Sequence, residues 1–322
     1  MSVLVYTESW NGSFKKASFE AVSYAAQLAN KLDTEVIALT IASTDDAAIL
    51  GNYGATKVLS VTDDSMATFN NHAYADAILT AAEANGVHTI VISNTNNGKS
   101  IAPILAAKRN AGLITNVIEL PSSTSPFTVK RKTFSSKAFA NYSTSSAQKV
   151  ISITPNAIGA VEIAATATTE SFDYTAKSSD NRLSSVSVDR ATGKISLIEA
   201  DFVVSAGRGL KGPENWGMIE ELAGLLGAAT ACSKPVSDIG WRPHGEHVGQ
   251  TGIAINPELY IAIGISGAIQ HLAGVNASKN IVVINTDPEA PFFKAADYGI
   301  VGDAFEVVPK LIEAIKKHKA NN

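Results

Sequence analysis

The first 120 residues alternate between short apolar runs and alanine-rich stretches with helical spacing. β-branched residues concentrate at positions 3–7, 34–42, 57–61 and 89–93. Between these runs, residues 17–30 and 74–84 place apolar side chains at intervals that put them on one face of a helix. Strands that alternate with helices of this length predict βαβ units and a parallel sheet.

The pattern changes in the middle of the chain. From residue 129 to residue 163, polar and apolar positions alternate, and serine and threonine become frequent. This alternation predicts antiparallel strands that extend the parallel sheet. Residues 166–193 are polar and lack a helical pattern, so we expect them to leave the first domain and form a linker.

A second alternation of strands and helices follows the linker. Its apolar runs are IEADFVVSA, ATACS, LYIAIGIS, NIVVIN and YGIVGD, and its helical stretches are residues 215–228 and 305–318. The sequence therefore predicts an α/β protein with two Rossmann-like parallel-sheet domains. The first domain, with its antiparallel additions and linker, is placed at residues 1–193, and the second at residues 194–322.

Charge narrows the classes of partner. Charged residues make up 17% of the chain, against roughly 25% in an average soluble protein. We infer that a partner subunit covers part of the surface and assign this partner-binding role to the first domain. The formal net charge of −4 argues against nucleic acid as a partner, because nucleic-acid binders carry a basic face.

The cysteine content and the N-terminal sequence limit which covalent and metal sites and which cellular location are expected. The single cysteine, Cys232, allows no internal disulfide and no cysteine-built metal site, so no metal is expected. The N-terminal sequence enters a strand pattern directly, without a signal peptide or a long apolar segment. We therefore expect a cytoplasmic protein without direct membrane insertion.

A glycine motif follows the apolar run at residues 198–206. In GRGLKG, Gly207, Gly209 and Gly212 have the spacing of a dinucleotide-binding loop, and a helical pattern follows. An NAD site of this kind has an acidic residue about 20 positions further on. The next strand ends instead in Ser233 and Lys234, and the lysine favours a negative or electron-rich group over NAD.

Two other motifs are interpreted without ligands. The stretch NTNNGKS resembles the end of a phosphate-binding loop, but Ser93 stands where its first glycine belongs, so we expect neither an ATPase nor a nucleotide site there. His244, Glu246 and His247 do not have the spacing of a known zinc motif, and a solvated loop is predicted. At the end of that loop, VGQTG offers a hydroxyl, an amide and accessible backbone N–H groups.

Polar residues follow four successive predicted strands. They are Arg208, then Ser233 and Lys234, then Ser266 to His271, then Asn285. In parallel sheets, ligands bind outside the carboxyl ends of the strands, so these residues are expected to line one site. His271 taken alone is more typical of a buried core histidine, but its neighbours favour a ligand. Cations, hydroxyls and amides with few carboxylates and no evident catalytic triad predict a site for an anionic, polar, flat cofactor.

The same residues resemble a known family. VVSAGRGLKGPENW, VGQTG, ELYIAIGISGAIQHLAG, INTDPEAPFFKAADYGIVGD and VVPKLIEAIKK closely resemble the α subunit of electron transfer flavoprotein, over roughly residues 200–315. The first domain resembles the family more weakly, in its alternation of strand-like and helix-like segments and in the motif GKSIAP. The resemblance implies a heterodimer with one FAD, held mainly by the second domain, and a β subunit that carries AMP.

The resemblance also implies a function. The family carries electrons from flavin dehydrogenases, such as the acyl-CoA dehydrogenases of fatty acid β-oxidation, to a membrane quinone reductase, without substrate turnover of its own. Both the dehydrogenases and the reductase would bind transiently. By position, the implied FAD contacts are Arg208, Ser233, Lys234, Val248, Gly249, Gln250, Thr251, Ser266, Gly267, Ala268, Ile269, Gln270, His271, Asn285, Asp303 and Ala304.

Three of these positions carry more specific implications. The Thr251 hydroxyl would meet the flavin N5 atom, and His271 would approach the O2 edge of the ring. The family usually has arginine at the position of Lys234, so the charge is kept but the planar group that stacks on the ring is lost.

Other functions remain open from the sequence. The chain could belong to an electron-bifurcating complex in which a second FAD in the partner meets NADH. It could also be an NAD-linked oxidoreductase that uses GRGLKG, which Lys234 disfavours, or a nucleotide-sensing module, which Ser93 disfavours.

Overall fold

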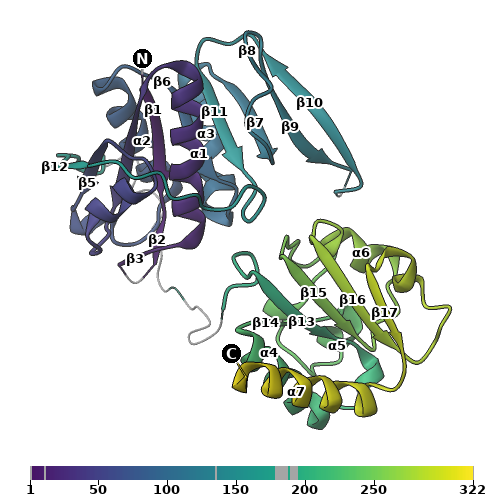
Figure 1. Ribbon diagram of the computed structural model, residues 1–322. Helices are drawn as coiled ribbons and strands as arrows, with labels where there is room; N and C mark the ends of the chain where they lie inside the picture. The colour runs from purple at the N-terminus through teal and green to yellow at the C-terminus, as the bar shows by residue number, and fades with distance from the viewer. Residues whose placement is uncertain (1, 11, 135, 178–187, 189–194, 322) are drawn as a thin grey trace. The chain divides into compact units, whose positions relative to one another are not determined.

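The computed structural model describes residues 2–10, 12–134, 136–177, 188 and 195–321. The chain divides into two compact units, one of residues 1–132 and 139–190, the other of residues 133–138 and 191–322. Both have strands and helices in alternation (Figure 1), and the predicted α/β class is confirmed. The predicted boundary between residues 193 and 194 lies outside the described residues.

The first unit is built on a large, mainly parallel sheet. Among the described residues its order is β10-β9-β7-β11-β6-β1-β4-β5-β12, with β8 paired to β9. The strands are β1 Ser2–Thr7, β4 Glu35–Ile41, β5 Lys57–Val61, β6 Val87–Ser93, β7 Gly112–Val117, β8 Ser123–Thr124, β9 Phe127–Thr133, β10 Ala138–Thr144, β11 Lys149–Ile153 and β12 Thr168–Ser171. A separate hairpin pairs β2 (Ser9–Trp10) with β3 (Ser13–Phe14). The strands predicted from the first four apolar runs are β1, β4, β5 and β6, and all four are confirmed.

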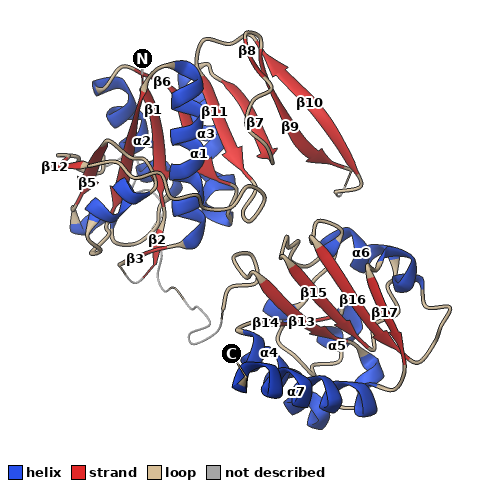
Figure 2. Cartoon of the chain, in the orientation of Figure 1, coloured by secondary structure: helices blue, strands red, loops and turns tan. Residues whose placement is uncertain are grey.

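Helices cover both faces of this sheet (Figure 2). Helix α1 (Lys16–Leu32) buries its apolar stripe on one face, where Val22 and Leu28 pack with Val5. Helices α2 (Asn71–Ala84) and α3 (Asn96–Arg109) cover the opposite face. The two helices predicted from alanine-rich stretches are α1 and α2, and both are confirmed. Short 3-10 helices η1 and η2 lie at Ala47–Asn52 and Asp64–Met66.

The prediction of antiparallel strands is right for one part of residues 129–163 and wrong for another. Strand β9 pairs antiparallel with β8 and β7. Strand β11, in contrast, lies between β6 and β7 and is parallel to both. Its Val150, Ile151 and Ile153 are fully buried, and burial on both faces is typical of an interior parallel strand.

The predicted linker also begins too early. Residues 168–171 form β12, which pairs parallel with β5 at the edge of the sheet. All four side chains of β12 are exposed, so a polar sequence is compatible with an edge strand that contributes only backbone pairing. Tyr174 is buried beyond it and donates to Asp76 (3.0 Å). Residues 178–187 and 189–193 of the predicted linker lie outside the described residues.

The second unit has a smaller, wholly parallel sheet of order β14-β13-β15-β16-β17. The strands are β13 Phe202–Ala206, β14 Ala229–Cys232, β15 Leu259–Ile263, β16 Asn280–Asn285 and β17 Tyr298–Val301. They correspond to the five predicted apolar runs. Helices α4 (Gly217–Leu226) and α7 (Ala304–Ala320) pack on one face, and α6 (Ile269–Val275) on the other. The remaining helices are α5 Lys234–Asp238, η4 Arg208–Leu210, η5 Pro213–Trp216, η6 His244–Glu246 and η7 Pro291–Ala295.

A buried carboxylate fixes the loop that follows β11 in the first unit. Glu20 of α1 is 2% exposed. Its carboxylate accepts hydrogen bonds from the backbone N–H groups of Asn156 (2.8 Å), Ile158 (2.9 Å) and Gly159 (2.9 Å). These bonds satisfy buried donors that no strand or helix would satisfy.

We predict that Glu20→Gln lowers the free energy of unfolding by about 1–3 kcal/mol, because one buried N–H group loses its acceptor. Urea unfolding of the chain measures the change. Glu35→Gln, at an exposed position, is the matched control and should leave stability unchanged. Equal stability of both variants would contradict the proposed role of Glu20.

Candidate functional site

The connection order of the second sheet creates a point where the chain reverses direction across the sheet. From β13 the chain passes to β14 on one side and then to β15 on the other. The connections that leave the carboxyl ends of β13 and β15 therefore diverge. Ligands of open α/β sheets bind at such switch points, and the GRGLKG and GISG turns lie at this one.

Glycines allow these two turns to touch. The N–H of Gly209 donates to the carbonyl of Gly264 (3.1 Å), and that of Gly207 donates to Ile263 (2.9 Å). A Cβ atom on Gly209 would lie 2.6 Å from the Cα of Gly264, and Gly264 itself has a φ of +61°. The glycine motif thus serves close backbone packing, and Arg208 is left exposed between its glycines.

The corner after β15 is similarly constrained. Gly267 has a φ of +81°, and a Cβ there would lie 2.6 Å from the backbone nitrogen of Phe292. Phe292 N–H donates to the Ser266 carbonyl (3.1 Å). Ser266, Ala268, Ile269 and Gln270 remain exposed, with Ile269 at 59%. The corner therefore presents backbone, a hydroxyl, an amide and two apolar side chains, those of Ala268 and Ile269, to solvent.

His271 differs from its neighbours because its side chain is interior. It is 7% exposed, its Nε2 atom is 2.8 Å from the Tyr260 hydroxyl, and its ring meets Phe292 edge-on. Burial, reinforced by the nearby His247, lowers the pKa of His271 to about 4. The imidazole is therefore neutral at pH 7. In its burial it matches the core histidine that the sequence around His271 taken alone predicts.

The loop at residues 248–251 is joined to that corner. Val248 N–H donates to the carbonyl of Cys232 (3.1 Å), the last residue of β14, so the loop starts beside the end of that strand. Gln250 N–H donates to the Gln270 carbonyl (2.7 Å). Gly249 has a φ of +151°, and a Cβ on Gly274 of α6 would lie 2.6 Å from it. The VGQTG loop and the Ser266–His271 corner thus form one assembly, with Gln250 and Thr251 exposed.

The segment before this loop is less solvated than predicted. His244 is exposed, as a solvated loop requires, but Glu246 is 6% exposed and His247 1% exposed, so the interpretation of a solvated loop is wrong for these two residues. Glu246 is paired with Arg242, whose Nε and Nη2 atoms donate to the two Glu246 oxygens at 2.7 and 2.8 Å. Arg242 also lies over the Trp216 ring (5.2 Å). A paired carboxylate can be buried where a lone one cannot.

Ser233 and Lys234 begin α5 at the end of β14. Ser233 is the N-cap, and its N–H donates to the Ala206 carbonyl (3.2 Å), so it lies beside the GRGLKG turn. The Lys234 ammonium forms an ion pair with Asp238 one turn later (3.1 Å), and both side chains are about half exposed. In this structure the Lys234 charge is therefore shared with a carboxylate.

The last predicted site residues follow β16 and β17. Asn285 Nδ2 donates to the Ile265 carbonyl (3.0 Å), which ties β16 to the corner after β15. Asp303 caps α7 by accepting from Phe305 N–H (2.9 Å), and Ala304 is buried in the first turn. The bond from Phe305 lowers the pKa of Asp303, and the Lys211 ammonium at 3.4 Å lowers it further.

The predicted site residues outside the 248–251 loop thus lie at or follow the carboxyl ends of strands in the second sheet, and that loop reaches the end of β14 through the bond from Val248 to Cys232. Hydrogen bonds join the 248–251 loop, the 266–271 corner and Asn285 directly, whereas the charged groups of Lys234 and Asp303 face Asp238 and Lys211. Sequence reasoning missed Tyr260, the partner of His271. A tyrosine in a buried strand signals a hidden polar contact, because its hydroxyl needs a partner.

Neither a metal site nor a membrane-spanning helix has support in the part of the chain that the structure describes. No group of three or more histidine, cysteine, aspartate or glutamate side chains there could hold a metal ion. None of the helices described combines the length and the apolar character needed to span a bilayer.

Comparisons with known proteins agree with the division of the chain. Residues 3–177 match the electron transfer flavoprotein domain, and residues 196–276 match the electron transfer flavoprotein FAD-binding domain. The second match includes the GRGLKG turn, the VGQTG loop and the corner after β15.

Similar proteins match over nearly their whole length. The chain is 37% identical to the electron transfer flavoprotein subunit alpha of Syntrophomonas wolfei, with 97% of this chain and 98% of that one covered. It is 37% identical to the subunit of the same name from Bacillus subtilis, with 98% and 97% covered. It is also 32% identical to Protein FixB of Azorhizobium caulinodans, with 98% of this chain and 88% of that protein covered. The chain therefore belongs to the electron transfer flavoprotein alpha subunit family.

Proposed function

We propose that the chain is an electron-carrying subunit that holds FAD at the carboxyl edge of its second sheet and works in a heterodimer with a β subunit. The observation that carries this proposal is the glycine-lined switch point between β13 and β15, which lies inside the segment matching an FAD-binding domain. FAD would supply one- and two-electron redox chemistry, and the chain would turn over no substrate of its own.

The residues at this edge fit such a molecule. A dinucleotide has an anionic pyrophosphate, which requires cations and backbone donors, and a flat ring, which requires hydrogen-bonding side chains and apolar contact. Arg208, exposed beside the glycine turns, is suited to the pyrophosphate. Gln250, Thr251 and Ile269 are exposed in the assembly formed by the VGQTG loop and the following corner, and they are suited to the ring.

His271 is buried beneath these exposed residues and would act on the flavin ring from the interior side. Because its imidazole is neutral and Tyr260 holds Nε2, the ring is fixed in orientation. In the proposed complex it would offer polarity, and not a full charge, to the O2 edge of the flavin. Its lowered pKa means that a positive charge there would be gained only in acid.

We further propose the wider role that the family implies. The partner would be an electron transfer flavoprotein β subunit carrying AMP, bound through the first unit. Electrons would come from flavin dehydrogenases such as acyl-CoA dehydrogenases and leave to a membrane quinone reductase, and the protein would be cytoplasmic. The names of the similar subunits support this proposal at the level of electron transfer.

The purified chain with its partner should show flavin absorbance at one FAD per pair. Two FAD per pair would favour the electron-bifurcating alternative, and no flavin would contradict the proposal.

Arg208→Ala should weaken FAD binding by roughly 10- to 100-fold, because it removes a charge-assisted hydrogen bond. Lys279→Ala is the control, because Lys279 immediately precedes β16, at the opposite edge of the sheet. Titration of the apoprotein with FAD compares them, and equal affinities would contradict the assignment of Arg208.

Lys234 and Asp238 should change the flavin potential in opposite directions. Lys234→Ala removes a cation near the proposed site and should lower the midpoint potential of the first electron by about 40 mV, which corresponds to about 1 kcal/mol. Asp238→Asn removes the carboxylate that pairs with Lys234 and should raise it. Spectroelectrochemical titration of each complex measures both. If both variants shifted the potential in the same direction, or neither did, Lys234 would not act on the flavin.

A further inference from the structure

The first unit has a switch point of its own. From β1 the chain passes to β4 and β5 on one side of the sheet and then to β6 on the other. The carboxyl ends of the neighbouring strands β1 and β6, at Thr7 and Ser93, are therefore the place where this fold binds ligands. In this unit the residues that follow the two strands are bonded to each other.

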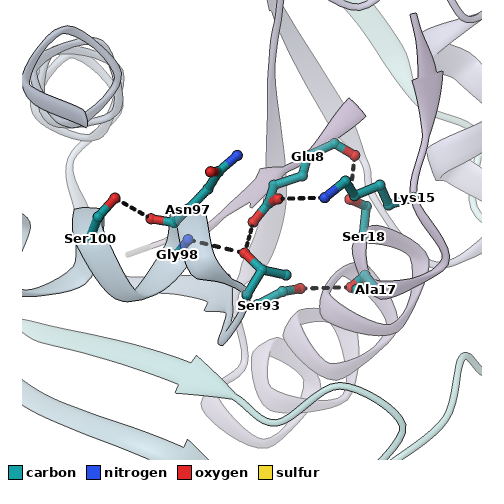
Figure 3. Close-up of polar contacts among 9 residues, drawn as sticks. Glu8, Lys15, Ala17, Ser18, Ser93, Asn97, Gly98 and Ser100 are labelled. Atoms are coloured by element: carbon teal, nitrogen blue, oxygen red, sulfur yellow. Dashed lines mark hydrogen bonds and ion pairs between the residues drawn. The ribbon is translucent and has the colours of Figure 1, made fainter. Parts of the chain in front are cut away.

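The bond is made by Glu8, the residue directly after β1 (Figure 3). Glu8 is 3% exposed. One carboxylate oxygen accepts a hydrogen bond from the hydroxyl of Thr95, which lies two residues beyond β6. The other is 3.2 Å from the ammonium of Lys15. An ionised group of this kind is kept out of water only when such partners compensate for its lost hydration.

The surroundings of this carboxylate are those of an anion site. Thr95 is the N-cap of α3 and accepts from Gly98 N–H (3.0 Å), so the positive end of the helix acts on Glu8 through the threonine hydroxyl. Lys15 is the residue preceding α1, and its backbone N–H donates to the Glu8 carbonyl (3.1 Å). The start of α3, through Thr95, and the Lys15 ammonium thus act on the Glu8 carboxylate, and the residue preceding α1 also holds the Glu8 backbone carbonyl.

The same place is closed by neighbouring contacts. Ser18 Oγ donates to the Glu8 carbonyl (2.7 Å), and Ser93 Oγ donates to the Ala17 carbonyl (2.8 Å). A Cβ atom on Gly98 would lie 1.9 Å from the Ser93 carbonyl oxygen, so the start of α3 is held tightly against the end of β6. The Ser18 and Ser93 hydroxyls and the Lys15 and Gly98 N–H groups are thus already bonded within the chain.

We propose that Glu8 is a built-in ligand of the first unit. Its carboxylate occupies the anion position at the β1–β6 switch point, which excludes phosphate-bearing ligands from the native chain. When the carboxylate is removed, Lys15, Thr95 and the start of α3 form a site for a phosphate group. This inference concerns the first unit alone and does not depend on FAD in the second.

Glu8→Ala in the full chain, with its partner, tests the proposal through thermal unfolding in inorganic phosphate, with potassium chloride at matched ionic strength. The unfolding temperature of Glu8→Ala should rise by about 2–4 °C at a phosphate concentration tenfold above the dissociation constant. The native chain should show no rise beyond that in chloride. Recovery of folding by phosphate, if Glu8→Ala is unfolded without it, would equally support the proposal.

Two further variants separate an anion site from general effects of phosphate. Glu8→Gln keeps the side-chain volume and should show no phosphate response, because the amide still fills the position. The double variant Glu8→Ala with Lys15→Ala should lose most of the response of Glu8→Ala. A phosphate response in the native chain, an equal response in Glu8→Gln, or none in a folded Glu8→Ala would each overturn the proposal.

Discussion

Parallel strand pairing is the constraint on which the rest of this structure depends. It sends the carboxyl ends of the strands in each parallel region to one edge, and the order of connections then selects one pair of strands whose loops diverge. In the first unit this pair is β1 and β6, and in the second it is β13 and β15. The two units share this architecture, and they differ in the residues that line the selected place.

The difference comes down to a few residues. In the second unit, Gly209 and Gly264 bring the two turns into backbone contact without side chains, and Arg208 stays exposed beside them. In the first unit, Glu8 supplies a buried carboxylate that Thr95 and Lys15 satisfy. One switch point is thus lined by backbone and by donors that remain accessible, whereas the other is filled from within. A single fold can in this way carry the proposed cofactor site in one unit and a closed, structural site in the other.

Local patterns were enough to predict most strands and helices of both units and to place the proposed site residues along one edge of the second sheet. They failed where neighbours distant in sequence decide the outcome. The parallel direction of β11 depends on its insertion between β6 and β7, and the polar edge strand β12 on its pairing with β5. The burial of His271 depends on Tyr260, and the role of Glu8 on Thr95, 87 residues later. A local pattern can show that Tyr260 needs a polar partner, but it does not show which distant residue that partner is.

Hydrogen–deuterium exchange of the complex, with FAD bound and after its removal, tests the central claim most directly. The account predicts that FAD slows exchange at residues 207–209, 248–252 and 264–271, around the glycine-lined switch point of the second unit. It predicts no change at residues 8–18 and 93–98, where Glu8 already occupies the corresponding place. Slower exchange at residues 8–18 and 93–98 on FAD binding, with none in the second unit, would contradict it.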